Sequence, residues 1–250
     1  DDHQHHHDDE HHEVDHDAEP AHREWGPPSA PATREDQAVE GETARGGVGG
    51  NLDVLVDTLI KETTDIARPR FIYNIFTLEK NSGILLKNTE LTLKGKDIAR
   101  HLEKSEKCAV LCATLGSEIE MKINYYSKTE LLKSVISDAC ASTLIEALCD
   151  YAEALIKTEA EKNGFFITGR YSPGYGDFEI SVQKDLLNLI EAPKKIGVTV
   201  TDSFIMLPRK SVSAVIGFQS EKAKEEINKC STCNLKGNCS FRKGNTYCGN

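Results

Sequence analysis

The stretch KTELLKSVISDACASTLIEALCDYAEALIKTEAEK, residues 128–162, carries the clearest periodic pattern in this sequence of 250 residues. Its apolar side chains recur at steps of three and four residues, which places them on one face of an α-helix. Asn163 and Gly164 follow directly and favour the end of a helix. We therefore predict one long amphipathic helix from Lys128 to Lys162 whose core-facing side is formed by Leu132, Val135, Ile136, Ala139, Cys140, Thr143, Leu144, Ala147, Leu148, Tyr151, Leu155 and Ile156.

The chain before this helix alternates helical and strand-like segments. Leu52 to Ile66 is predicted as one helix and Lys94 to Ser105 as another. Phe71 to Phe76 is rich in residues that favour strands, although a helix also fits its pattern. The continuous apolar run CAVLCATL, residues 108–115, is typical of a buried strand.

The chain after the helix is shorter in its elements and richer in turns. A short strand over 165–169 is followed by a loop over 170–176, and Asp177 is a predicted N-cap for a helix that reaches about Ile190. Helices and strands are mixed without a regular βαβ rhythm, and neither a G-x-G-x-x-G nor a G-x-x-x-x-G-K-[ST] sequence is present. We predict a single compact α+β domain over 51–222, with further strands at Gly197–Thr201 and Ser211–Phe218.

The acidic character of the chain is confined to its first fifty residues. The net charge is −10, yet residues 1–50 alone carry 14 Asp and Glu against three Arg, which leaves the other 200 residues nearly neutral. The overall charge argues against a nucleic-acid-binding protein. The segment 1–50 is too poor in apolar residues to form a core, so we predict a disordered tail. Its eight histidines could bind divalent metals loosely. The alternative is that they belong to a solvated low-complexity segment.

Membrane and secreted classes find no support in the sequence. The longest uncharged apolar stretches fall far short of the roughly 20 residues that cross a bilayer. The first residues are acidic and rich in histidine, where a secretory signal would be basic and then apolar. We expect a cytoplasmic protein.

Two spaced motifs carry a family resemblance. The sequence RYSPGYGDF spans Arg170 to Phe178, and TDSFIMLPRKSVSAVIGF spans Thr201 to Phe218. Together they resemble the R-x-x-x-G-Y loop and the T-[ED]-S-x-x-M-x-P-x-x-S-V-S segment of the activation domain of cobalamin-dependent methionine synthase. The resemblance extends through DACASTLIEALCDYAEALI, residues 138–156, and covers about residues 60–220. It implies the α+β fold of that domain, with a mixed, largely antiparallel sheet.

The resemblance also implies a function. The chain looks like a free-standing activation subunit that binds S-adenosylmethionine and supports reductive methylation of cob(II)alamin. The cobalamin would be carried by a partner, either a methionine synthase subunit or another corrinoid protein, and flavodoxin or ferredoxin would donate the electron. No side chain of this chain need act as a catalytic acid, base or nucleophile, because the reaction depends on positioning. The alternative is a non-catalytic module that binds S-adenosylmethionine or a corrinoid protein, as a sensor or chaperone.

The loop motif supplies the candidate ligand-binding residues. Arg170 offers a planar fork for the carboxylate of S-adenosylmethionine, and Glu146 of the long helix matches a family glutamate that suits its ammonium group. Tyr175 offers a ring and a hydroxyl, while Pro173, Gly174 and Gly176 let the backbone approach the adenosine. The alternative interpretation makes Arg170 a surface ion-pair partner and S-P-G-Y-G an ordinary turn. Four residues are predicted as architectural: Ser203, Pro208, Ser211 and Ser213.

Residues 223–250 are predicted to form a Cys-rich metal-binding extension, which holds half of the eight cysteines. The spacing Cys230-x2-Cys233-x5-Cys239-x8-Cys248 can hold one metal centre, either zinc or an iron-sulfur cluster, and disulfides would be the alternative in a secreted protein. We favour the cluster because it could relay an electron to cobalamin. The other cysteines are predicted to be small core residues: Cys108, Cys112, Cys140 and Cys149.

Overall fold

The computed structural model describes residues 49–80 and 83–221, and it confirms the predicted α+β fold. Six of its strands form one sheet in the spatial order β3-β2-β1-β4-β8-β5, with each neighbouring pair antiparallel. Two more strands form a separate antiparallel pair, β6 with β7. The strands are β1 (Arg70–Lys80), β2 (Ile84–Leu86), β3 (Thr92–Leu93), β4 (Ser105–Thr114), β5 (Phe166–Ile167), β6 (Thr199–Val200), β7 (Met206–Leu207) and β8 (Ser211–Gln219).

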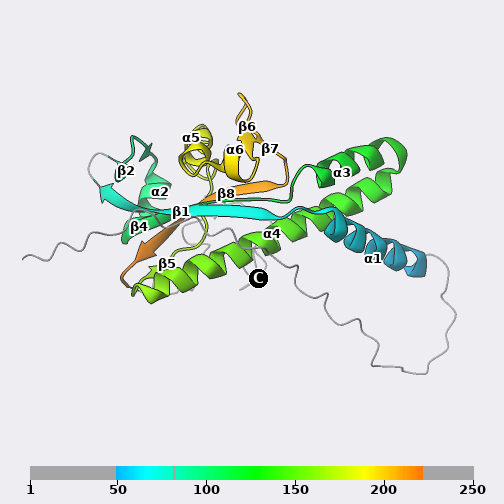
Figure 1. The fold of residues 1–250 in the computed structure, drawn as a ribbon, viewed down its shortest axis with the longest axis horizontal. Helices are drawn as coiled ribbons and strands as arrows, with labels where there is room; N and C mark the ends of the chain where they lie inside the picture. The colour runs from blue at the N-terminus through cyan, green and yellow to red at the C-terminus, as the bar shows by residue number, and fades with distance from the viewer. Residues whose placement is uncertain (1–48, 81–82, 222–250) are drawn as a thin grey trace, which may run out of the picture.

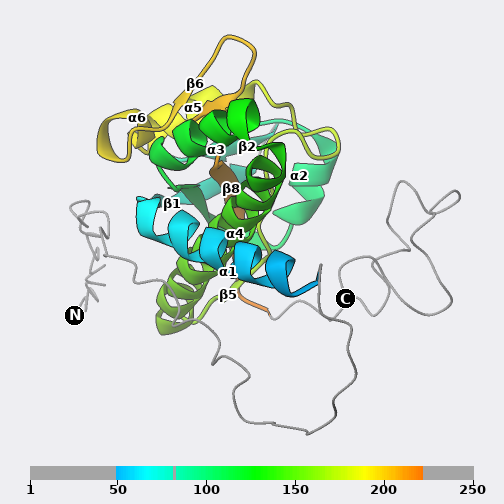
Figure 2. The ribbon, with the colours of Figure 1, turned by 90° about the vertical axis from the view of Figure 1, so that its right-hand side faces the viewer.

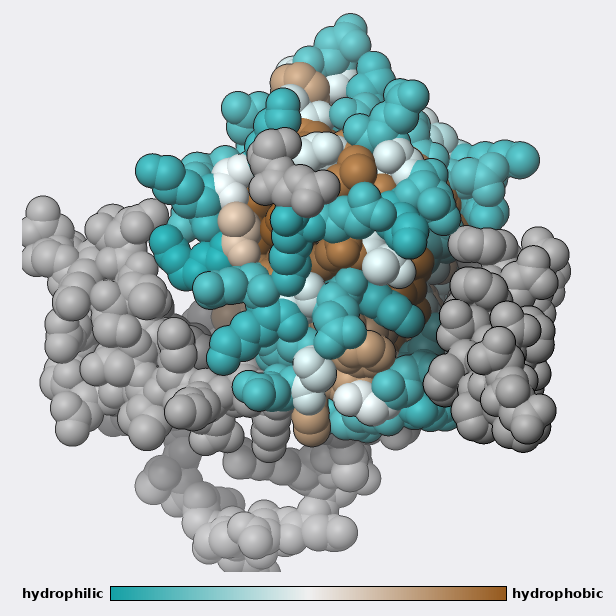
Figure 3. Space-filling model, turned by 90° about the vertical axis from the view of Figure 1, so that its left-hand side faces the viewer, coloured by the Kyte–Doolittle hydropathy of each residue, from teal (hydrophilic) through white to brown (hydrophobic). Residues whose placement is uncertain are grey.

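Helices cover both faces of the six-stranded sheet (Figure 1). The long helix α4 (Leu131–Lys162) runs below the sheet in that view, and α2 (Lys96–His101), α5 (Val182–Leu189) and α6 (Ala192–Lys195) lie above it. Figure 2 looks from the end where α1 (Gly49–Ile66) and α3 (Glu118–Thr129) gather around the start of α4. Figure 3 shows the opposite end, where hydrophilic side chains surround smaller apolar areas.

The central strand β4 explains the continuous apolar run in the sequence. Its alternate side chains belong to two different cores, one between the sheet and α4 and one between the sheet and α2, α5 and α6. A strand covered on both faces needs apolar residues at every position. The prediction of a buried strand is therefore confirmed, with Ala109, Leu111 and Ala113 in the first core and Cys108, Val110 and Cys112 in the second.

The long helix differs from its prediction at its start and in its face. Lys128 belongs to α3, and the backbone of Glu130 leaves the helical conformation (φ −148°, ψ 79°) and separates α3 from α4. The predicted core residues Leu132 and Val135 are 57% and 61% exposed. The buried side of α4 consists of Ser134, Ser137, Ala141, Ile145, Leu148, Cys149, Ala152, Ile156 and Ala160. Most of these side chains are small, which lets the helix approach its neighbours closely.

Other segment predictions hold with altered boundaries. The predicted helix at Leu52–Ile66 is α1, the segment 71–76 is a strand within β1, and Gly197–Thr201 contains the short strand β6. The predicted helix at Lys94–Ser105 shortens to α2, because Ser105 already begins β4. The helix predicted from Asp177 begins only at Val182, so the assignment of Asp177 as its N-cap is wrong.

Candidate functional site

The loop 170–176 is anchored to the sheet by its own backbone. Tyr171 forms an isolated antiparallel bridge with Val215 of β8, with N···O distances of 2.9 and 2.8 Å. Further along, the Gly174 N–H donates to the Phe178 carbonyl at 2.8 Å and closes the turn. The loop therefore lies along β8, opposite the middle of α4.

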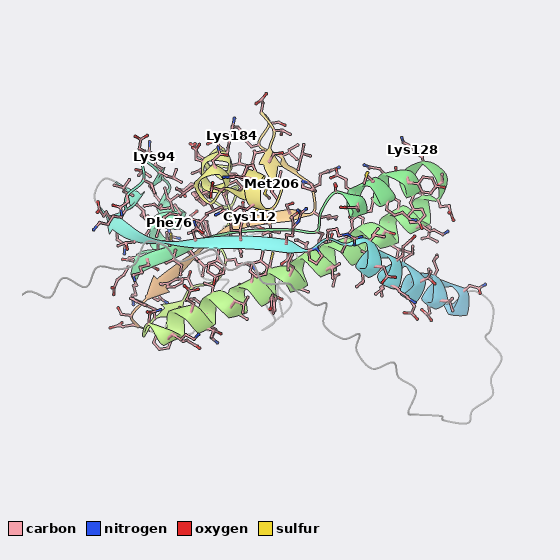
Figure 4. The ribbon with its side chains drawn as sticks, viewed as in Figure 1. Phe76, Lys94, Cys112, Lys128, Lys184 and Met206 are labelled. Carbon is pink, nitrogen blue, oxygen red and sulfur yellow. The ribbon has the colours of Figure 1, made fainter. Side chains whose placement is uncertain are left out.

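A cavity of about 400 Å³ opens between this loop, α4 and β8. Figure 4 marks its place by Met206, which lies above the middle of the sheet, far from Lys128 at the tip of the α3–α4 hairpin. Of the six predicted binding residues, four line the cavity and two, Gly174 and Gly176, do not. Its lining consists of Glu146, Arg170, Tyr171, Ser172, Pro173, Tyr175, Gln183, Met206, Ser211, Val212 and Ser213.

Arg170 lies in contact with three carboxylates of α4. Its Nη1 is 2.8 Å from Asp150 Oδ1 and 3.0 Å from Glu153 Oε2, and its Nη2 is 3.3 Å from Glu146 Oε2. These acids recur at steps of four and three residues, so one face of the helix presents all of them to one guanidinium. The group of four side chains, which we call the Arg170 cluster, carries a formal charge of −2.

Burial shifts the protonation equilibria of this cluster. Burial raises the pKa of Glu153; the charge of Arg170 opposes the rise, and that of Asp150 adds to it. Burial alone would lower the pKa of Arg170, but the hydrogen bond with Asp150 and the charge of Glu153 outweigh it, and the pKa is raised. Arg170 is thus a permanent cation whose side chain is 21% exposed.

The two loop glycines that stay outside the cavity have backbone conformations that the turn requires. Gly174 and Gly176 have φ values of 93° and 54°, which favour glycine because it lacks a Cβ. A Cβ on Gly176 would also overlap Asp97 Oδ2 and approach the Tyr171 hydroxyl to 2.9 Å. Their predicted role in admitting the adenosine stays a prediction.

The serines of the second motif are bound to their neighbours rather than free to react. The Ser211 hydroxyl donates to the Pro208 carbonyl at 2.6 Å and lies 2.8 Å from the Thr114 hydroxyl. The Ser213 hydroxyl donates to Gln183 Oε1 at 3.1 Å. These contacts agree with an architectural role in the cavity wall.

Five lining residues were not identified from the sequence. Four of them, Tyr171, Ser172, Met206 and Val212, stand inside the two recognised motifs, so their position was a signal in itself. Gln183 lies on α5 and gave no such signal. Its Nε2 donates to the Phe204 carbonyl at 3.0 Å and so ties α5 to the turn before β7.

Three of the four described cysteines lie in the two cores, and the prediction of Cys140 as a core residue is wrong. Cys108, Cys112 and Cys149 are buried, as predicted, and Cys140 is partly exposed. Burial raises the pKa of Cys108 to about 12, so its thiol stays protonated at neutral pH. Cys230, Cys233, Cys239 and Cys248 lie outside the described residues, so their metal site stays a prediction.

Residues 49–80 and 83–221 hold no group of three or more His, Cys, Asp or Glu side chains arranged for a metal ion. None of the helices in this part of the chain is long and apolar enough to cross a membrane. The histidine-rich segment predicted to be disordered also lies outside the described residues.

Comparisons with known proteins identify the family and the fold. A family model described as vitamin B12 dependent methionine synthase, activation domain, matches residues 87–237, more than half of the chain. The crystal structure of the MetH reactivation domain bound to AdoHcy matches with a TM-score of 0.53 at 18% sequence identity, over 74% of this chain and 72% of that chain. At this identity the structural match shows a common fold. No curated protein sequence matches the chain.

Proposed function

The chain belongs to the family of the vitamin B12 dependent methionine synthase activation domain, and from this we propose that it binds S-adenosylmethionine in the cavity between α4 and the loop 170–176. Its role is that of an accessory subunit for reductive methylation. S-adenosylmethionine supplies the methyl group, and cobalamin on a partner chain accepts it after a one-electron reduction. The partner is a methionine synthase subunit or another corrinoid protein, and the electron comes from flavodoxin or ferredoxin.

The observation that carries this proposal is the cavity itself. Its volume of about 400 Å³ lies in the range usual for small-ligand sites. It brings a fork-shaped cation, Arg170, beside a carboxylate, Glu146, as the two ends of a zwitterionic amino acid require. Tyr175, 65% exposed at the rim, offers a ring to the adenosine.

The charge of the Arg170 cluster favours a sulfonium ligand. When Arg170 binds the ligand carboxylate, the three acids of α4 remain near the ligand's positive groups. S-adenosylmethionine carries two positive groups, and AdoHcy, which lacks the methyl group, carries one. Glu153 is 30% exposed, whereas Glu146 and Asp150 are 63% and 72% exposed, so this surplus of negative charge attracts the sulfonium in a site that solvent partly screens.

We expect the chain to bind S-adenosylmethionine about tenfold more tightly than AdoHcy at low ionic strength. Isothermal titration calorimetry of both ligands at low and high salt measures this ratio. Salt screens charges, so the ratio should shrink as its concentration rises. Equal affinities at low salt would contradict the electrostatic argument, and no binding of either ligand would contradict the proposed site.

Apolar side chains near the cavity favour a methyl donor for a second protein over a closed ligand sensor. Ile205 and Leu207, the chain neighbours of the lining residue Met206, are 53% and 41% exposed. A donor must present its methyl group to an acceptor on another chain, which requires an open site with a surface for the partner. The non-catalytic binding module remains the alternative function.

Methyl transfer separates the two functions. The purified chain is mixed with its cobalamin-bearing partner, a low-potential reductant and S-adenosylmethionine labelled in the methyl group. We expect methylcobalamin to form, followed by its absorbance and by label on the cobalamin. Binding without transfer would indicate the sensor or chaperone.

The C-terminal cysteines enter this proposal as ligands of an iron-sulfur or zinc centre. Only an iron-sulfur cluster could relay the electron, because zinc has no accessible redox couple.

A further inference from the structure

The short helix α2 contacts the ligand loop at both of its ends but contributes no residue to the lining of the cavity. The two segments are about 75 residues apart in the sequence. Backbone N–H groups and a side-chain ring of α2 contact residues in and next to the loop, so the loop packs directly against the helix.

The first contact joins the end of the loop to the start of α2. Asp177 follows the loop directly, and its carboxylate accepts hydrogen bonds from the backbone N–H groups of Lys96 at 2.6 Å and Asp97 at 2.9 Å. These two bonds hold the pKa of Asp177 below its usual value. Asp177 therefore caps a helix that precedes it by 80 residues.

Glycines on both sides make this approach possible. Gly95 has a φ of 130°, and a Cβ there would lie 2.8 Å from Asp177 Oδ1. On the loop, a Cβ on Gly176 would overlap Asp97 Oδ2. A methyl group at either position would push the loop away from the helix.

The second contact joins the beginning of the loop to the last residue of α2. The rings of His101 and Tyr171 stack with centroids 5.0 Å apart and planes 30° apart. The Nε2 of His101 is 2.9 Å from Thr168 Oγ1, which also accepts the Gly217 N–H of β8 at 2.8 Å. Burial lowers the pKa of His101, and a hydrogen bond with the backbone of Gly169 opposes this shift.

Tyr171 links His101 to the cavity, because it stacks on His101 and also lines the cavity. Its backbone pairs with Val215, and its ring lies 6.3 Å from that of Tyr175. A change in the position of the His101 ring would therefore reach Arg170 and Tyr175 through one residue.

We propose that α2 is the platform that holds the loop 170–176 in its ligand-binding shape, with His101 and Asp177 as positioning residues at its two ends. Neither residue lines the cavity. The effect on affinity rests on the proposed binding of S-adenosylmethionine, whereas the effect on loop order does not.

Hydrogen exchange of the full chain without ligand tests the platform directly. Amides of Thr168, Tyr171 and Gly174 donate to carbonyls of Gly217, Val215 and Phe178, so they report local opening of the loop. In His101→Ala and Asp177→Ala we expect exchange over 168–178 to become about fivefold faster, while β4 stays unchanged. Ala99→Ser, an exposed change on the same helix, should leave both regions as they are.

Conservative variants separate positioning from general weakening. Asp177→Asn keeps an oxygen that can accept from the helix N-terminus, and His101→Phe keeps a ring that can stack on Tyr171. We expect each to restore most of the protection lost in its alanine variant. A rescue of this kind would not follow from nonspecific destabilisation.

Calorimetry with S-adenosylmethionine completes the test. The two alanine variants should bind about fivefold more weakly than the wild type. Each conservative variant should have an affinity between those of its alanine variant and the wild type. Unchanged exchange over 168–178 would overturn the platform. Faster exchange with unchanged affinity would overturn its control of the ligand. If the wild type does not bind S-adenosylmethionine, the proposed function fails, and exchange alone decides the platform.

Discussion

Replacing Leu148 by alanine should lower the free energy of unfolding by about 2 to 5 kcal/mol, the usual cost of truncating a fully buried leucine. Leu148 is 0% exposed and lies in the core between α4 and the sheet. The loss combines the apolar contacts of the removed atoms with the cavity they leave. Urea unfolding, followed by circular dichroism, measures the change.

Leu132→Ala is the matched control, because the sequence pattern gives both leucines the same role. Leu132 is 57% exposed near the start of α4. Its truncation should cost less than about 0.5 kcal/mol, as expected for a surface position. A large loss at Leu132, or a small one at Leu148, would contradict the observed face of the helix.

Replacing Arg170 by alanine should weaken binding of S-adenosylmethionine about ten- to a hundredfold. Loss of a bidentate charged hydrogen bond costs about 1.5 to 3 kcal/mol, which corresponds to that range. The substitution also leaves Glu146, Asp150 and Glu153 without the cation that they contact. Calorimetry should therefore be paired with urea unfolding, so that affinity is compared between folded proteins.

Two further variants show whether the fork matters or only the charge. Arg170→Lys keeps a positive charge but loses the planar pair of donors, so we expect an intermediate affinity. Arg70→Ala removes an exposed arginine at the start of β1 and should leave the affinity unchanged. Wild-type affinity in Arg170→Ala would remove Arg170 from the site and favour its interpretation as an ion-pair partner.

The sequence by itself determined the class of fold and most of its elements. Continuous apolar residues over 108–115 are typical of a buried strand, and β4 is a strand covered on both faces. Periodicity located α4 to within three residues of its start, and Asn163-Gly164 ended it. Local signals of this kind extend over a few residues, so they can be recognised without knowing which elements pack against the segment.

The motifs also indicated where the site would form. The loop motif named Arg170, Pro173 and Tyr175, the resemblance over the long helix named Glu146, and the structure brings all four to one cavity. The motifs could not show that Arg170 contacts Asp150 and Glu153, because only the packing of the loop against α4 creates that cluster.

The tertiary structure alone decided which face of α4 is buried and which helix Asp177 caps. Apolar residues recur at helical spacing on more than one side of α4. The side that packs against the sheet is the one with mostly small side chains, because these permit close approach. Asp177 had a helix ahead of it in sequence but met the free N–H groups of α2 in space. Burial and hydrogen bonding depend on the neighbours that folding supplies, and those neighbours can lie far away along the chain, as Asp97 does at 80 residues from Asp177.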